Sequence, residues 1–398
     1  MKAKVIISAA SMLLLIAAGV LLAVKNNITP KNNRTTETSE PGEVSVTEAI
    51  TEEPYIPPVF VECSSEDIHR GSLILVNREY AYKEGSNSDL ANIYSMKSDS
   101  YKVNTVDMRL DKNMILAMNS MLDDFKAATG ITDVLANSGY RSYSEQQIMY
   151  ENDLETTGLS ESELVAPPGN SEHHTGYAMD FAIDDGYSYP ALKNEEDYTW
   201  IYDNAHKYGM ILRYTEQNKH ITGYMAESWH FRYVGPVHAT LIRQMGVAYE
   251  EYVGFLKDFT FDRPLEYKYS DDEFYMIYYV PADMESGKTE IPITFDAYGD
   301  KDRYSISGNN SDGFIVTLRI DELSDDYDDS YLYMFNPIQE NVPVDDFSYE
   351  EPVQENAAAD ENVQEDAVPD ENGQGESAEV PNQEETQSGD AENAGEGW

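Results

Sequence analysis

The chain contains a single cysteine, Cys63, among 398 residues, so no disulfide can form within it. Small exported domains commonly depend on disulfides, and a protein without them must be held together by its core or by a metal. No catalytic histidine context surrounds Cys63, which argues against an amidase or transpeptidase with a thiol nucleophile. The thiol is interpreted as a bystander near a linker.

Positive charge is also scarce. The sequence has 27 Lys and Arg residues against 74 Asp and Glu, which gives a formal net charge of −47. Proteins that bind nucleic acid carry a basic footprint, so we expect no nucleic-acid partner. No Lys or Arg follows Arg319, while acidic residues recur to the end of the chain. This balance predicts solubility and surface repulsion.

A long apolar run lies at the N-terminus, from Val5 to Val24, after Lys2 and Lys4. About 20 apolar residues can span a bilayer as a helix, and no small-x-small cleavage site follows. We therefore predict that residues 1–25 form an uncleaved anchor of a single-pass cell-membrane protein, with an extracellular catalytic domain. A cleaved signal peptide, which would make the protein secreted, is the alternative.

Composition divides the remaining chain into four parts. Residues 26–59 are rich in Thr, Glu, Pro and Ser and are predicted to form a flexible stalk. Residues 341–398 are acidic and of low complexity and are predicted to be a disordered tail. Between them we expect a catalytic domain at 60–256 and a small all-β module at 257–340.

Apolar periodicity in the region 60–256 predicts an α+β domain, with a small antiparallel sheet and flanking helices. Helices are expected to begin after the caps Asp111 and Ser142, and at Glu195 and Pro236. Strands are expected at 71–77, 131–136, 176–183, 210–214 and 227–234.

The region from 257 onward contains Tyr-, Ile- and Val-rich runs separated by turn residues, at 274–280, 290–295 and 313–320. Such runs are typical of short strands. The tyrosines could form a carbohydrate-binding face, but packing inside a small sheet is the favoured interpretation.

Two imidazoles and two carboxylates stand out in two short segments. A catalytic zinc needs three protein ligands of N or O type, an open position for water and a nearby base. His173, Asp180 and His230 can supply the ligands. Four other histidines lack a matching carboxylate context and are interpreted as structural: His69, His206, His220 and His238.

Glu227 can supply the base, although its spacing from His230 sets a geometric condition. Side chains three residues apart on a regular strand point to opposite faces. The strand must therefore bend, or begin after Ser228, if both are to reach one metal. The alternative for Glu227 is a solvated surface acid.

Arg141 lies at a predicted strand end that leads into a helix. Its planar guanidinium could hold a carboxylate or stabilise a developing oxyanion. An ordinary surface ion pair is the alternative.

Together these residues form three motifs that resemble the VanY-type zinc D-alanyl-D-alanine carboxypeptidases. These belong with the LAS metallopeptidases, which also include L,D-carboxypeptidases and D,D-dipeptidases. The resemblance covers roughly residues 71–233. The motifs are Ser138-Gly139-Tyr140-Arg141-Ser142 with Gln146, Ser171-Glu172-His173 with Thr175-Gly176, Ala178 and Asp180, and Glu227-x-Trp229-His230-x-Arg232-Tyr233.

The resemblance implies roles for seven residues of these motifs. It implies Zn²⁺ held by His173, Asp180 and His230, with Glu227 as the base. It also implies Arg141 near the scissile carbonyl or the substrate carboxylate, and Ser171 and Gln146 in substrate binding. His174 stands where such proteins often carry Gln, so it is not assigned to the metal, and the spacing to Gly176 and Asp180 selects His173.

The predicted activity is removal of the terminal D-alanine from peptidoglycan stem peptides, which are the expected partners. An L,D-carboxypeptidase acting on tetrapeptide stems is the nearest alternative. A catalytically inactive wall-binding protein is a third, which the presence of every proposed catalytic residue disfavours. The sequence makes no prediction of oligomeric state.

Overall fold

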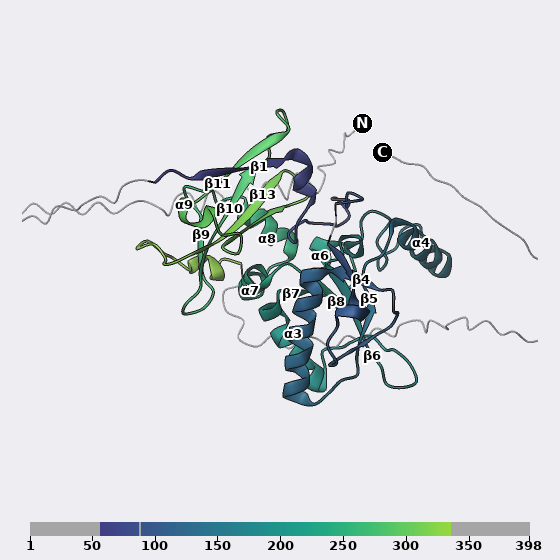
Figure 1. Ribbon diagram of the computed structural model, residues 1–398. Coiled ribbons are helices and arrows are strands. Elements are labelled where there is room, and N and C mark those ends of the chain that lie inside the picture. Colours follow the sequence, from purple (N-terminus) through teal and green to yellow (C-terminus); the bar gives the residue numbers. More distant parts are fainter. Residues whose placement is uncertain (1–55, 87–88, 336–398) are drawn as a thin grey trace, which may run out of the picture. The chain divides into compact units, whose positions relative to one another are not determined.

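The computed structural model describes residues 56–86 and 89–335 (Figure 1). The predicted anchor and acidic tail, and the stalk up to residue 55, lie outside the described residues. The chain divides into two compact units, whose described parts are 56–61 with 291–301, and 62–290 with 302–335. The smaller unit contains the first half of β1 (Val59–Ser64), the second half of β11 (Lys288–Ile293) and α9 (Phe295–Tyr298).

The larger unit contains a mixed five-stranded sheet of order β3-β5-β6-β8-β7. The predicted antiparallel pairing is confirmed among β5, β6, β8 and β7, whereas the edge strand β3 runs parallel to β5. The strands are β3 (Lys102–Val103), β5 (Val134–Ser138), β6 (Ala178–Ile183), β7 (Met210–Tyr214) and β8 (Glu227–Tyr233). Two further short strands, β2 (Leu90–Asn92) and β4 (Arg109–Asp111), pair with each other.

Helix α3 (Lys112–Thr129) covers one face of this sheet (Figure 1). It begins and ends as predicted, because the Asp111 carboxylate accepts a hydrogen bond from the Asn113 amide and Gly130 adopts a left-handed φ of 79°. Buried side chains of the helix share an apolar cluster with Met179, Phe181 and Phe231 of the sheet. Since neighbouring strand residues face opposite ways, Asp180 and His230 point away from α3.

The remaining helices surround the sheet. Ser142 caps α4 in a capping box with Glu145, as the sequence predicts. The expected helix over 195–208 is wrong as one element, because α5 is flanked by 3₁₀ turns on both sides. The helices are α2 (Ile93–Met96), α4 (Tyr143–Thr157), α5 (Thr199–Asn204), α6 (Lys219–Thr222), α7 (Pro236–Met245) and α8 (Tyr249–Leu256).

The strand expected at 71–77 is also wrong. Leu73 to Val76 are buried, but the segment forms no ladder. Its backbone groups find other partners: the Arg232 side chain donates to the carbonyls of Ser72 and Ile74, and the Leu75 amide donates to the Asn309 carbonyl. A buried segment can satisfy its backbone without joining a sheet.

A separate four-stranded antiparallel sheet has the order β12-β13-β10-β9. The runs predicted at 274–280 and 313–320 form β10 (Phe274–Pro281) and β13 (Gly313–Ile320), while β9 (Leu265–Lys268) and β12 (Tyr304–Gly308) were not predicted. Its tyrosines Tyr267 and Tyr278 are buried, as expected for packing.

Helices α7 and α8 share one apolar cluster with β9, β10 and β13. His238 of α7 also bridges to this sheet, since its two ring nitrogens lie 2.7 Å from the hydroxyls of Tyr252 and Thr317. This apolar cluster contains residues from both sides of position 256. No helix within 56–86 and 89–335 is both long enough and apolar enough to cross a membrane.

Candidate metal centre

The predicted ligands His173, Asp180 and His230 come together on the face of the central sheet that α3 leaves uncovered. These three residues are called the metal group below. One ligand atom from each lies within 4.8 Å of the others. Asp180 and His230 are direct cross-strand partners on β6 and β8. His173 comes from a 3₁₀ turn (Glu172–Thr175) that Ser171 begins and Gly176 ends. The loop-to-strand junction predicted from the sequence therefore brings the segments together.

Hydrogen bonds determine which nitrogen of each imidazole faces the metal group. His173 Nδ1 donates to the Gly139 carbonyl at 2.7 Å, which leaves Nε2 at 3.1 Å from Asp180 Oδ2. His230 Nε2 lies 3.3 Å from Glu172 Oε2, which leaves Nδ1 at 3.0 Å from Asp180 Oδ1. The two rings meet nearly at right angles, at 88°. Such outer hydrogen bonds are how proteins set the tautomer and orientation of ligating histidines.

The Asp180 carboxylate is charged in this setting. Burial alone would raise its pKa, but the charges and hydrogen bonds of His173 and His230 hold the pKa of Asp180 well below its usual range. A carboxylate that stays ionised is what a cation site requires.

Glu227 lies beside His230, with its Oε2 3.6 Å from His230 Nδ1. The bend that this arrangement requires is present: β8 residues Glu227 to Phe231 lie opposite only Leu212 to Tyr214 of β7, so the register shifts there. Burial raises the pKa of Glu227 to about 8, against the opposing effect of the His230 charge. A carboxyl with a pKa near neutrality suits general acid–base work.

Arg141 is held rigidly at the edge of the cluster. Its Nη2 donates to Ser138 Oγ at 2.8 Å and lies 3.9 Å from Asp180 Oδ2, while its Nη1 donates to Gln146 Oε1 at 2.8 Å. The guanidinium is thus no surface ion pair. Its position beside the metal group allows it to face a reacting carbonyl or carboxylate.

Gln146 and Ser171, the two predicted substrate-binding residues, are both buried. The Gln146 amide is engaged at both ends, since its Nε2 donates to the Ala166 carbonyl at 2.7 Å and its Oε1 accepts from Arg141. Ser171 Oγ accepts a hydrogen bond from the His173 amide at 3.4 Å. These contacts hold Arg141 and His173 in place.

His174 lies outside the metal group. Its Nδ1 donates to the Arg141 carbonyl at 2.7 Å, and its Nε2 accepts from the Gly169 amide at 3.0 Å. With both nitrogens occupied, His174 fixes the loops around the site. The choice of His173 over its neighbour agrees with this geometry.

Four charged residues behind the site were missed: Glu172, Arg213, Arg232 and Glu250. Glu172 Oε1 accepts from Arg213 Nε at 2.9 Å and from Arg232 Nη1 at 3.0 Å. Burial alone would raise the pKa of Glu172, but the two guanidinium groups hold it well below its usual range. The available signal was an arginine among apolar residues in each of two predicted strands, because a buried charge needs a partner.

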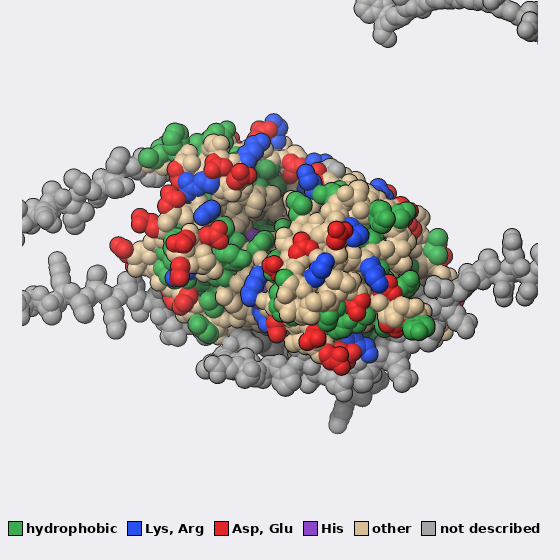
Figure 2. Space-filling view, turned by 60° about the horizontal axis from the view of Figure 1, so that its bottom comes forward, with side chains coloured by type: hydrophobic (Ala, Val, Ile, Leu, Met, Phe, Trp, Pro, Cys, Tyr) green, Lys and Arg blue, Asp and Glu red, His purple; other side chains and the backbone are tan. Residues whose placement is uncertain are grey.

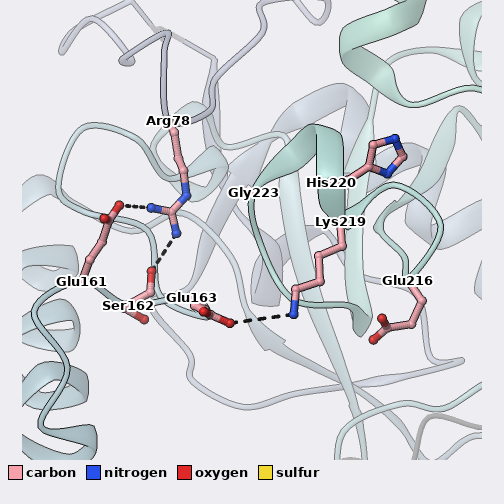
Figure 3. A pocket seen from close by; sticks show the side chains of 8 residues that line it. All are labelled: Arg78, Glu161, Ser162, Glu163, Glu216, Lys219, His220 and Gly223. Carbon is pink, nitrogen blue, oxygen red and sulfur yellow. Dashed lines mark hydrogen bonds and ion pairs between the residues drawn. The ribbon is translucent and has the colours of Figure 1, made fainter. Parts of the chain in front are cut away.

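A pocket of about 780 Å³ is lined by residues of α6 and of the segment Glu161 to Glu163 (Figure 3). Arg78 donates to the Glu161 carboxylate and to the Ser162 carbonyl across it, and Lys219 pairs with Glu163 at 3.8 Å. Its other lining residues are Glu216, His220 and Gly223.

A row of packed side chains connects this pocket to the metal group. The Arg78 guanidinium lies 4.5 Å from the centre of the Tyr224 ring, whose centre lies 5.4 Å from that of Tyr214. The Tyr214 ring in turn lies 4.9 Å from the His230 ring. The pocket is therefore joined to the ligands by a continuous row of packed groups.

The face seen in Figure 2 carries Lys and Arg side chains interspersed with Asp and Glu.

Comparison with known proteins agrees with the motifs. Residues 107–236 match the sequence model of the family VanY: D-alanyl-D-alanine carboxypeptidase. The chain is 30% identical over 258 residues to a D-alanyl-D-alanine carboxypeptidase of Enterococcus faecium, covering 64% of this chain and 77% of the relative. It is 37% identical over 135 residues to the bifunctional D-Ala-D-Ala dipeptidase and carboxypeptidase VanXYC of Enterococcus gallinarum, covering 32% and 71%.

A solved structure shares the fold. The D,D-dipeptidase VanXYg, determined in complex with a D-Ala-D-Ala phosphinate analogue, matches with a TM-score of 0.58 and 29% identity. The match covers 66% of this chain and 99% of that one.

Proposed function

We infer that this chain, which belongs to the VanY family of D-alanyl-D-alanine carboxypeptidases, is a zinc enzyme that removes the terminal D-alanine from peptidoglycan stem peptides. The main support within this chain is the arrangement of five side chains. The ligand atoms of His173, Asp180 and His230 lie within 4.8 Å of one another, with Glu227 and Arg141 beside them.

The donor set fits zinc. Two imidazole nitrogens and one carboxylate oxygen are borderline and hard donors of the kind that catalytic zinc takes, with a further position left for water. The donors would be His173 Nε2, His230 Nδ1 and an Asp180 oxygen. A zinc ion held there supplies a Lewis acid and lowers the pKa of water to about 7.

The chain's own groups would carry the proton and the charge. Glu227 would accept a proton from the attacking water and pass it to the leaving amine. Arg141 presents a fixed positive charge to the carbonyl oxygen or to the terminal carboxylate of the peptide. Gln146 and Ser171 support the reaction by fixing Arg141 and His173, respectively.

The activities for which relatives are named favour a D,D-pentapeptide over a tetrapeptide as the substrate. The relatives from Enterococcus faecium and Enterococcus gallinarum are named for action on D-Ala-D-Ala. The alternative activity is that of an L,D-carboxypeptidase, whose substrates are tetrapeptide stems.

The test is a product analysis on matched stems. Purified enzyme is incubated with a pentapeptide stem, a tetrapeptide stem and the free dipeptide, each with and without a zinc chelator, and products are identified by mass spectrometry. We expect loss of one D-alanine from the pentapeptide only, abolished by chelator and restored by zinc. Cleavage of the tetrapeptide alone would reassign the specificity, and no cleavage by a zinc-loaded, folded enzyme would refute the peptidase function.

We also propose that residues 1–25 anchor the protein in the cell membrane with its catalytic domain outside. The support is the apolar run after Lys2 and Lys4. Fractionation of cells expressing the full chain tests this, because an anchored protein sediments with membranes and is released by detergent. Recovery of a shortened protein from the medium would instead support secretion.

A further inference from the structure

We propose that Glu172 is a positioning residue for the metal ligand His230, an inference that rests on the proposed zinc site. Glu172 Oε2 lies 3.3 Å from His230 Nε2, on the side of the ring away from the cluster. An imidazole that donates from Nε2 keeps the lone pair of Nδ1 free for a metal. Nδ1 is the nitrogen that faces Asp180, at 3.0 Å.

The Glu172 carboxylate is prevented from rotating. Its other oxygen, Oε1, accepts hydrogen bonds from Arg213 Nε and Arg232 Nη1, at 2.9 and 3.0 Å. The side chains of Glu172, Arg213 and Arg232 have no exposed surface. With Oε1 fixed from two directions, Oε2 is left with His230 as its partner.

The two arginines are themselves fixed by separate elements. Arg213 of β7 donates from both terminal nitrogens to Glu250 of α8, one of these bonds being 3.0 Å long. Arg232 of β8 donates to the Ser72 and Ile74 carbonyls, at 3.0 and 2.8 Å. The position of the His230 ring is therefore determined by contacts that reach across the fold.

The charges of this cluster balance without His230. Two carboxylates, Glu172 and Glu250, face the guanidinium groups of Arg213 and Arg232. Burying such a cluster of charges costs desolvation free energy, so the cluster need not make the fold more stable.

A purely structural role for Glu172 is the competing explanation, and metal affinity separates the two. Zinc dissociation constants are measured on the metal-free full chain by competition with a chelating dye, for wild type, Glu172→Gln and Glu250→Gln. Glu250→Gln is the matched control, because it removes a carboxylate from the same arginine without touching His230. Thermal melts with and without zinc show that each variant is folded.

We expect Glu172→Gln to weaken zinc binding about 10–100-fold, the usual effect of losing an outer partner of a ligating histidine. Glu250→Gln should lower the melting temperature while changing the zinc affinity by less than about threefold. Unchanged zinc affinity in folded Glu172→Gln would overturn the proposal, as would an equal loss in both variants.

Glu172→Asp covers the case in which Glu172→Gln does not fold. It keeps the negative charge for the arginines but withdraws the oxygen from His230 by one methylene. Weaker zinc binding supports positioning, and wild-type affinity refutes it. A wild-type protein that binds no zinc would instead refute the proposed function, so the two failures can be told apart.

Discussion

The two faces of the central sheet are built from alternate residues of the same strands, yet they differ in kind. On β6, Met179 and Phe181 enter the apolar cluster under α3, while Asp180 between them joins the metal group. On β8, Phe231 belongs to the apolar cluster, and its neighbours His230 and Arg232 lie on the charged face.

This difference separates stability from chemistry. The apolar face needs only burial, worth roughly 1.5–3 kcal/mol for each large side chain. The opposite face must pair every buried charge, because an unpaired one costs several kcal/mol. Substitutions on the apolar face should therefore lower the free energy of unfolding. Substitutions on the charged face should change metal binding or turnover.

The largest effect on turnover is expected for Glu227→Gln. The amide keeps the shape of the side chain but cannot accept the proton, so kcat should fall about 10²–10⁴-fold, while zinc content stays at the wild-type level. Steady-state hydrolysis and metal analysis check this, with the exposed Glu322→Gln as the control. Near-wild-type turnover in the folded variant would exclude Glu227 as the base.

Phe125→Ala tests the apolar face. Phe125 is fully buried on α3 and packs against Tyr198 and Trp200, so its truncation should lower the free energy of unfolding by about 3–5 kcal/mol. The kcat of the folded fraction should not change. The control is Leu116→Ala on the same helix, whose side chain is 48% exposed and whose loss should cost within about 0.5 kcal/mol. If Phe125→Ala lowered kcat as much as Glu227→Gln is expected to do, the apolar face would affect turnover as well as stability, and the two faces would not differ in this way.

Arg141→Lys tests whether the charged face depends on shape as well as charge. Lysine keeps the charge but cannot contact Ser138 and Gln146 together while facing Asp180. We expect a loss of about 10–100-fold in kcat/KM, by analogy with removal of a single oxyanion donor. A fall in kcat would place Arg141 at the developing oxyanion, and a rise in KM at the substrate carboxylate. Unchanged kinetics would remove it from the site.

The sequence predicted those features that depend on neighbouring residues. Asp111, Ser142 and Gly130 act as helix caps because capping is decided within a few residues. The metal group was predicted because His173 and Asp180 share one short segment, and because Glu227 and His230 share another. The period of two in β6 correctly separated Asp180 from its apolar neighbours.

What could not be predicted depends on contacts between distant segments. Glu172 contacts Arg213, Arg232 and His230, which with it come from three separate elements, and no local pattern pairs them. The segment 71–77 has the composition of a strand, but its carbonyls are taken by the Arg232 side chain, which lies far along the chain. Propensity alone cannot anticipate such a partner.

The smallest effect, a pH dependence, distinguishes two buried histidines. His230 lies among carboxylates, whereas His238 lies between the hydroxyls of Tyr252 and Thr317, with no charged partner in contact among the described residues. Burial lowers the pKa of His238 to about 3, from an ordinary value of 6.5. The unfolded chain therefore binds a proton at His238 that the folded protein does not between these two pH values. Its contribution to stability is complete above pH 6.5 and is lost as the pH falls toward 3.

His238→Gln should remove this dependence, because glutamine keeps a donor and an acceptor but does not titrate. Wild-type stability should fall by up to about 1.4 kcal/mol for each pH unit below 6.5 on account of His238, and the variant should lack that part of the slope. Urea unfolding of both proteins at several values between pH 6.5 and pH 5 measures the difference. If the free energy of unfolding of the two proteins changed equally with pH, His238 would take up its proton in the folded state as well. The surroundings of His238 would then not differ from those of His230 in this respect.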